Sequence, residues 1–230
     1  AARMLAVSKA MSGAPVYLSD NPDHFNLEHI WPLCYEDGEL LRTLAPAAPL
    51  PESLFVNPFE GGVPFRAVAP LSGGAAAIVV YNFTEPVVPV SCSIVPDDYK
   101  EAACLIQQDG KGCEKWPLPP EGLYMYDWYA ETGQRLERPH LFTLEAFADR
   151  LFLLTPIVRG WSVIGRSDKY LSPASVETML AGENELIIRM TESGPLLLWS
   201  EREPSAIHFE GSEYAPRQSG TGIWRFPLPI

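Results

Sequence analysis

Carboxylates are the side chains in this sequence most able to bind or transform a polar substrate, and Asp20 is placed best for it. Asp20 ends the apolar segment Pro15–Asp20, and a polar loop and a helix-like segment follow. A strand, a loop and a helix in this order form a β/α unit, and in β/α barrels the carboxyl end of a strand faces the active site. The alternative is a turn or helix-capping acid, because Asn21-Pro22 follows and Asp favours such positions.

Two other pairs of acids carry less promise. Glu36 and Asp37 are adjacent, but Asp-Gly is a common turn signal and neighbouring side chains on a turn point apart, so we predict a turn. Asp97-Asp98 has the ligand type for calcium, yet no Asp-x-Asp-x-Asp-Gly loop follows it. We expect a solvated loop there.

Histidine and cysteine give no metal pattern. His24 and His29 are five residues apart, whereas two ligands on one helical face need a spacing of three or four, and His140 and His208 stand alone as structural residues. We therefore predict no metal and no cofactor. Cysteine occurs without a CxxC pair, and we expect free thiols. The four cysteines are Cys34, Cys92, Cys104 and Cys113.

Catalytic motifs of other enzyme classes are missing from the sequence. There is no Gly-x-Ser-x-Gly, no His-Glu-x-x-His and no phosphate-binding loop. Cys113 follows Lys111, which favours a thiolate, but no histidine lies nearby in sequence. We assign no catalytic residue to this chain.

Aromatic residues at alternate positions could stack on sugars or fill a core. Tyr124, Tyr126 and Trp128 lie on one face of a predicted strand, which is typical of a sandwich core, and we predict the core. Asn82-Phe-Thr84 matches a glycosylation acceptor, but no secretion signal accompanies it.

The elements that position these residues are mainly β. Short apolar runs punctuated by glycine-containing turns indicate an antiparallel β-sandwich. Helices are plausible only at 142–147 and 174–180. The predicted strands are 64–69, 75–81, 87–95, 124–129, 151–154, 161–164, 185–190, 195–199, 207–209 and 223–226.

The beginning of the chain has a different pattern. Residues 1–11 predict a helix that Ser12-Gly13 ends, residues 15–20 a strand and residues 25–31 a helix. A proline-rich segment from 45 to 51 marks the boundary between a β/α unit, residues 1–45, and a sandwich domain, residues 46–230. Because the chain opens in a helix without an initiator Met, we expect it to be part of a longer protein.

Charge and hydropathy exclude several partners. The net charge is −12 and the 17 basic residues are scattered, which argues against nucleic acid and against anionic membranes. The sequence has no run of about 20 apolar residues and no signal peptide, so we expect a cytoplasmic protein. Its oligomeric state is open.

Four stretches carry a family resemblance. Ala6–Asp20, with Ser-Gly-Ala-Pro-Val-Tyr-Leu-Ser-Asp, resembles the last barrel repeat of the raffinose synthase and seed-imbibition group of α-galactosidase relatives, although Ala14 replaces a glycine. Glu36–Arg42 is similar to the family's Pro-Asp-Gly-x-x-Leu-Arg, but Glu52–Phe55 lacks the Asp-Cys pair that usually follows. Ala77–Thr84 and Pro156–Gly165 are similar to strands of the family's carboxy-terminal sandwich.

This resemblance implies a carboxy-terminal fragment of an enzyme acting on α-galactosides, by hydrolysis or by galactosyl transfer. Residues 1–35 would end an eight-fold barrel, and the catalytic carboxylate pair would lie on earlier strands that this chain lacks. Tyr17, Ser19 and Asp20 would contact the sugar, and the missing amino-terminal barrel would be the partner. The alternatives are a self-contained carbohydrate-binding or interaction sandwich, and a complete hydrolase of another class.

Overall fold

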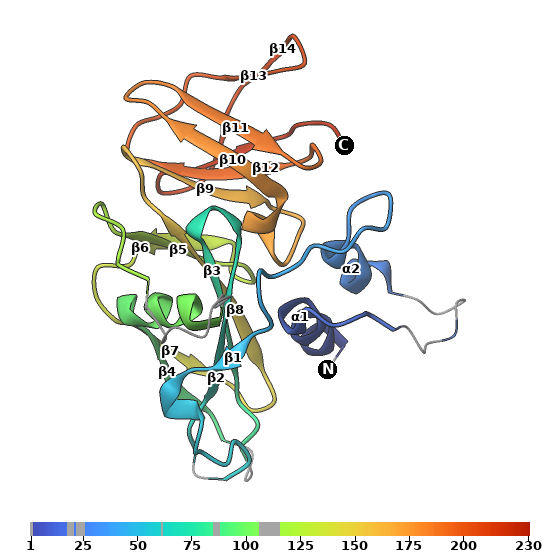
Figure 1. Cartoon of the computed structure of the whole chain (residues 1–230), viewed down its shortest axis with the longest axis vertical. Coiled ribbons are helices and arrows are strands. Elements are labelled where there is room, and N and C mark those ends of the chain that lie inside the picture. The colour runs from blue at the N-terminus through green and yellow to red at the C-terminus, as the bar shows by residue number, and fades with distance from the viewer. Residues whose placement is uncertain (1, 18–20, 22–25, 61, 85–87, 106–115) are drawn as a thin grey trace.

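The structure, a computed structural model, describes residues 2–17, 21, 26–60, 62–84, 88–105 and 116–230. It is mainly β, and the strand pairs within the described residues are antiparallel, which confirms the predicted fold class (Figure 1). No helix among the described residues is both long and apolar enough to cross a membrane.

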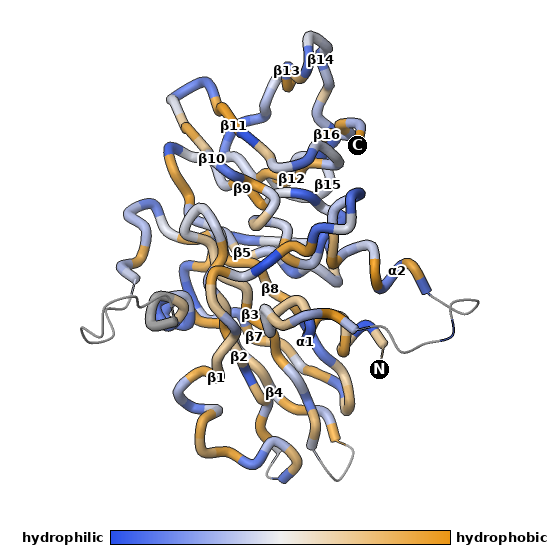
Figure 2. The backbone as a smooth tube through the Cα atoms, turned by 45° about the vertical axis from the view of Figure 1, so that its right-hand side comes forward, coloured by the Kyte–Doolittle hydropathy of each residue, from blue (hydrophilic) through white to orange (hydrophobic). Residues whose placement is uncertain are grey.

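A six-stranded sheet forms the centre of the molecule. Alternate residues of β3 enter two different cores, Val79 and Tyr81 on one face and Ile78 and Val80 on the other. Both faces are therefore covered, which explains why this strand is an unbroken apolar run (Figure 2). The order is β1 (Ala48–Pro49), β2 (Phe65–Pro70), β3 (Ala76–Tyr81), β8 (Asp149–Pro156), β5 (Leu123–Asp127) and β6 (Thr132–Arg135).

One face of this sheet is covered by the N-terminal helix α1 (Ala2–Ser12). Val7 and Met11 of α1 are buried in the same core as Tyr124 and Tyr126, so the prediction that these tyrosines are core residues is confirmed. The Ser8 hydroxyl lies 2.7 Å from that of Tyr81. The predicted boundary near residue 45 stays a prediction, since α1 and the sheet share one core.

The other face packs against a second, two-stranded sheet and a long 3-10 helix, as in a sandwich. The two strands are β4 (Val90–Ile94) and β7 (His140–Leu144), and the 3-10 helix covers Pro96–Leu105. Cys92 and Ile94 of β4 and Phe152 of β8 meet in this core.

A further four-stranded sheet with two hairpins forms one end of the molecule (Figure 1). The order is β15 (Arg217–Gly220), β16 (Ile223–Phe226), β12 (Leu196–Ser200) and β9 (Trp161–Arg166). The hairpins are β10 (Val176–Ala181) with β11 (Leu186–Met190), and β13 (Ile207–Phe209) with β14 (Ser212–Tyr214).

The predicted strands all occur, with shifted ends, and the helix at 1–11 is α1. The two later helices were wrong: residues 142–144 lie in β7 and residues 176–180 in β10. β7 pairs with the distant strand β4, and β10 pairs with β11 in a hairpin. This pairing outweighs the local helix propensity. The helix at 25–31 is shorter, α2 (Leu27–Ile30) followed by a 3-10 turn that contains Pro32. Of the predicted strand 15–20, residues 15–17 lie in no strand and 18–20 lie outside the described residues.

Candidate functional site

The three residues predicted to contact substrate are only partly placed. The side chain of Tyr17 is 81% exposed, on the segment that follows α1. Ser19 and Asp20 lie outside the described residues. The structure therefore neither brings these side chains together nor separates them, and their contact with sugar stays a prediction.

The acids at 36–39 form the predicted turn. The Asp37 carboxylate accepts a hydrogen bond from the Glu39 amide (2.9 Å), and Gly38 has a φ of +89°. The described residues contain no group of three His, Cys, Asp or Glu side chains with the geometry to hold a metal ion. Cys34 and Cys92 are free thiols.

The prediction of a solvated loop at Asp97-Asp98 was wrong for Asp98, which is buried. Its carboxylate accepts hydrogen bonds from the Val95 amide (2.9 Å) and from the Arg66 guanidinium (2.8 Å). Burial raises the pKa of Asp98, although these hydrogen bonds oppose the shift. The ion pair with Arg66 joins the 3-10 helix to β2 and offsets the cost of burying the acid.

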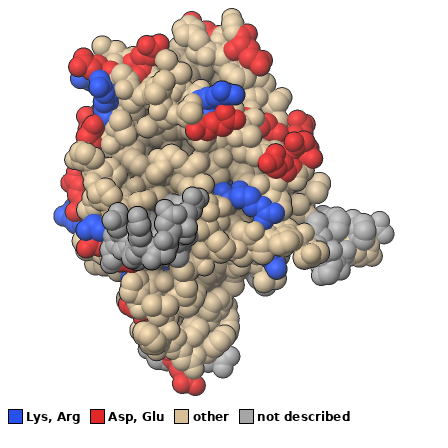
Figure 3. Space-filling model, in the orientation of Figure 1, with Lys and Arg blue, Asp and Glu red and all other residues tan. Residues whose placement is uncertain are grey.

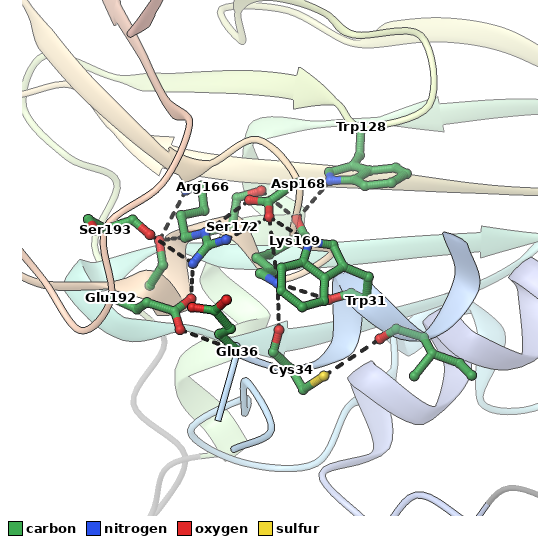
Figure 4. Close-up of polar contacts among 12 residues, drawn as sticks. Trp31, Cys34, Glu36, Trp128, Arg166, Asp168, Lys169, Ser172, Glu192 and Ser193 are labelled. Carbon is green, nitrogen blue, oxygen red and sulfur yellow. Dashed lines mark hydrogen bonds and ion pairs between the residues drawn. The ribbon is translucent and has the colours of Figure 1, made fainter. Parts of the chain in front are cut away.

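Two fully buried cations, Arg166 and Lys169, lie where the N-terminal segment meets the β-rich part of the chain (Figure 4). Arg166 ends β9, and Asp168 and Lys169 follow in the next loop. Trp31 comes from the 3-10 turn after α2, and Glu192 from the loop after β11. We call these five residues the junction cluster.

The Arg166 guanidinium holds two acids at once. Its Nε and Nη2 donate to the two carboxylate oxygens of Asp168 (3.0 and 2.7 Å), a bidentate geometry that suits a planar guanidinium. Its Nη1 donates to the Glu192 carboxylate and to the Ser193 carbonyl oxygen (3.0 Å). Gly194 leaves room for this arrangement, because a Cβ there would lie 2.7 Å from the guanidinium carbon.

The Lys169 ammonium fixes the N-terminal segment by its backbone. Nζ donates to the carbonyl oxygens of Trp31 (2.9 Å) and Cys34 (2.5 Å), and lies 3.9 Å from the centroid of the Trp31 ring. The Trp31 indole in turn donates to Asp168 (3.0 Å). One residue pair, Trp31 and Lys169, thus combines hydrogen bonding with a cation–π contact.

Neighbouring contacts hold the loop that carries Lys169. The Tyr170 amide donates to the Pro32 carbonyl (3.1 Å), and the Trp128 indole donates to the Lys169 carbonyl (2.8 Å). The rings of Trp128 and Tyr170 lie with centroids 4.7 Å apart. The loop is therefore tied to the N-terminal segment on one side and to the central sheet on the other.

The charges of the junction cluster balance, with two cations and two carboxylates. Burial alone would raise the pKa of Asp168, but hydrogen bonds and charge from Arg166 outweigh it and hold the pKa below its usual range. Burial lowers the pKa of Lys169, while the charge of Asp168 opposes the shift. Burial alone would lower the pKa of Arg166, but Asp168 and Glu192 hold it above its usual value. The charged side chains bind one another and backbone carbonyls, an arrangement for attachment rather than for catalysis.

The sequence analysis missed the junction cluster. Arg166-Ser-Asp-Lys169 directly follows an apolar strand, and such a run of charges usually indicates a solvated turn. A signal was present in Gly165, the last residue of the motif Pro156–Gly165. It has a φ of +99°, and a Cβ there would collide with the Ser172 carbonyl, so the strand must end against the returning loop.

Comparison with known proteins identifies the N-terminal third of the chain. Residues 1–84 match the family model described as "Raffinose synthase or seed imbibition protein Sip1". This match covers little more than a third of the chain. An Arabidopsis thaliana protein named "Probable galactinol–sucrose galactosyltransferase 6" is 34% identical over 82 residues, which are 36% of this chain and 11% of that protein. The chain therefore corresponds to a small part of this relative.

Two solved structures are similar at low identity. A "putative alpha-galactosidase" from Bacteroides fragilis has a TM-score of 0.40 at 10% identity, over 68% of this chain and 28% of that one. A "putative alpha-N-acetylgalactosaminidase" from Bacillus halodurans has a TM-score of 0.28 at 9% identity, over 41% and 18%. Scores of this size are too low to assign a shared fold.

The family match divides the junction cluster. Trp31 lies within the matched residues 1–84, whereas Arg166, Asp168, Lys169 and Glu192 lie beyond them. The matched segment ends just after β3, in the centre of the six-stranded sheet. The contacts of the junction cluster therefore join the segment that matches the family model to the rest of the chain.

Proposed function

We propose that this chain is the carboxy-terminal part of an enzyme that acts on α-galactosides, by hydrolysis or galactosyl transfer. Residues 1–35 are the end of its β/α barrel, and the sheets brace that barrel from outside. The family match over residues 1–84 and the galactosyltransferase name of the Arabidopsis relative support the proposal.

The observation that carries this proposal is the attachment of residues 31–34 to Lys169. Two backbone carbonyls of the N-terminal segment are bound by one buried ammonium, at 2.9 and 2.5 Å. Burying an ammonium is costly unless it is fully paired, so such a group is used where position matters more than net stability. A β-domain that holds the last turn of a barrel in place needs this kind of contact.

The catalytic carboxylate pair belongs, in this proposal, to barrel strands that precede residue 1. Tyr17, Ser19 and Asp20 then contact the sugar at the barrel mouth. Leu5 and Leu27 of the N-terminal segment are 63% and 69% exposed, and Tyr17, which lies between them in the sequence, is also exposed. Exposed apolar side chains on this segment suit a surface that the remainder of a barrel covers.

The test compares the native gene product with the 230-residue chain. An antibody against this chain should detect a protein larger than 25.5 kDa, with room for a barrel of about 250 residues. The immunoprecipitated protein should release or transfer galactose from galactinol or a nitrophenyl α-galactoside, and the purified 230-residue chain should not. Turnover by the purified chain, or a native band of its own size, would overturn the proposal.

The self-contained carbohydrate-binding module is the second candidate, and its main feature is lost. It relied on the aromatic residues between 124 and 129 as a sugar platform. Tyr124 and Tyr126 are buried in the core beneath α1, and Trp128 donates its indole hydrogen to the Lys169 carbonyl. A platform for sugar would need these faces exposed.

We place the enzyme in the cytoplasm. The free thiols of Cys34 and Cys92 suit a reducing compartment. Asn82, in the glycosylation motif, is fully buried, and its amide nitrogen donates to the carbonyls of Val88 (2.8 Å) and Leu144 (3.0 Å). Fractionation of source cells with the same antibody tests this placement, and recovery in the secreted fraction would contradict it.

A further inference from the structure

A groove runs over the four-stranded sheet and includes Trp161, at the end of β9 opposite to Arg166. Two adjoining cavities of about 720 and 490 Å³ share the lining residues Trp161, Glu183 and Arg202. The larger cavity lies between the four-stranded sheet and the hairpins β10–β11 and β13–β14. We call the two cavities together the β9 groove. Their size is that of small-ligand sites in proteins.

Trp161, which lines both cavities, is held by a tight turn. The Val158 amide donates to the Trp161 carbonyl (2.8 Å) and the Trp161 amide donates back to Val158 (3.0 Å). Arg159 and Gly160 between them have φ of +53° and +76°, the pattern of a two-residue hairpin turn. The Glu121 carboxylate accepts both of their amides, at 2.7 and 2.9 Å, which lowers the pKa of Glu121.

The floor of the groove is apolar and well packed. Leu196 and Leu198 of β12 and Phe226 of β16 are buried there, and Trp161 packs against the same core while remaining half-exposed. An indole ring that is held at one side and open at the other presents an apolar surface to a ligand.

The rim of the groove is polar, with Glu121 and Glu201 bound to other groups of the chain and three further charged side chains less engaged. Among the described residues, Glu183, Arg202 and Glu203 make no ion pair, and the guanidinium of Arg202 has one hydrogen bond, to the Asn184 side chain (3.3 Å). These groups are exposed. Their donors and acceptors are therefore open to a ligand, in contrast to those of the junction cluster.

The charge of the rim selects among ligands. Acidic side chains outnumber basic ones around the larger cavity, where Glu183, Glu185, Glu203 and Glu210 face one arginine, Arg202. Figure 3 shows acidic side chains over the end of the molecule that carries the hairpins. Phosphate, sulfate and acidic sugars would be repelled. Hydroxyl groups can donate to carboxylates and accept from a guanidinium, and so match this rim.

We propose that the β9 groove binds a neutral oligosaccharide. The apolar C–H face of a sugar ring lies on Trp161, and its hydroxyls bond to Glu183, Arg202 and Glu203. This inference rests on the proposed function in one respect, that the protein handles carbohydrate. Neither Tyr17 nor any of the five junction-cluster residues lines the groove, so it holds a saccharide chain without taking part in bond cleavage.

The test is a titration of the 230-residue chain with stachyose, a neutral tetrasaccharide, followed by NMR chemical shifts. We expect saturable shifts at the residues of the groove, with a Kd in the range of about 0.1–10 mM. Trp161→Ala should weaken binding at least about tenfold, as loss of an aromatic anchor does. Phe55→Ala is the matched control, because Phe55 is 97% exposed and lies outside the groove.

Three outcomes would overturn the proposal. They are no saturable shift up to roughly 20 mM stachyose, unchanged binding by Trp161→Ala, and equal binding of the acidic trisaccharide trigalacturonate. If circular dichroism shows that Trp161→Ala does not fold, Arg202→Ala on the exposed rim decides by the same titration. Failure here leaves turnover by the native gene product unaffected, so the two proposals fail separately.

Discussion

The polar side chains near the two ends of β9 differ in burial and in pairing. At Arg166 two fully buried cations are paired with two carboxylates, whereas near Trp161 the side chains of Glu183, Arg202 and Glu203 are exposed and make no ion pair among the described residues. Both ends are fixed by the same antiparallel pairing with β12, in which Arg166 faces Leu196 and Trp161 faces Ser200. One six-residue strand thus carries the junction cluster's Arg166 at one end and the groove's Trp161 at the other.

Burial decides how much stability is lost when a charged residue is removed. A buried ion needs its partners, so the removal of one leaves the others unpaired at a high cost. An exposed ion is solvated, so its removal changes stability little and affects mainly the binding of a ligand that it contacts. The junction cluster should therefore govern stability, and the β9 groove should govern binding.

The largest effect is expected from Arg166→Met. This change removes the buried guanidinium that binds two acids, so Glu192 loses its cation and Asp168 keeps only Lys169 (3.6 Å), and we expect a loss of about 3 kcal/mol in the free energy of unfolding. Urea unfolding measures it. Arg217→Met is the control, because Arg217 is exposed and unpaired among the described residues. It should change stability by less than about 0.5 kcal/mol. Equal losses of stability in the two variants would contradict the expected difference between buried and exposed charges.

A smaller, pH-dependent effect is expected from Asp168→Asn. The pKa of Asp168 is lowered in the folded state, so its contribution is present above the unfolded pKa and is lost as pH falls through the folded pKa. The variant should be less stable than the wild type by about 2 kcal/mol at pH 7. The gap should begin to close below about pH 4. Asp98, whose pKa is raised, is present in both proteins, so its effect on stability cancels in the difference between them.

The measurement is urea unfolding of both proteins between about pH 3 and 7, the range over which Asp titrates. Asp97→Asn serves as control, since the Asp97 side chain is 73% exposed and its replacement should change the free energy of unfolding by less than about 0.5 kcal/mol. A gap for Asp168→Asn that is constant with pH would show that its charge does not stabilise the junction cluster.

Much of the β fold could be predicted because its strands are apolar and punctuated. β3 and residues 196–199 of β12 are unbroken apolar runs that each follow a glycine-containing turn, and both are central strands. β7 could not be predicted, because its residues are neither uniformly apolar nor clearly alternating, and its partner β4 lies about fifty residues earlier. Non-local pairing of this kind leaves no mark on the segment itself.

The candidate sites were less predictable than the fold, for a physical reason. Sequence analysis looks for catalytic types at catalytic spacings, and it found Tyr17, Ser19 and Asp20 by their resemblance to a motif. Lys169 and Trp31 are 138 residues apart, and only the fold brings them together. Trp161 was placed on a predicted strand, but most of the charges around it come from other segments, which only the fold brings close.

The smallest effect, and the sharpest test of the open end of β9, is expected from Glu121→Gln. A carboxamide has one oxygen where the carboxylate uses two to accept the amides of Arg159 and Gly160, so the turn that carries Trp161 loosens. The melting temperature should stay within about 2 °C of the wild type. The Kd for stachyose should rise about threefold, because an anchor that is less fixed loses more freedom on binding. Glu137→Gln, which removes an exposed partner of Arg135, is the control and should change neither. Unchanged binding in Glu121→Gln would mean that the turn does not position Trp161, and that the two ends of β9 differ in burial alone.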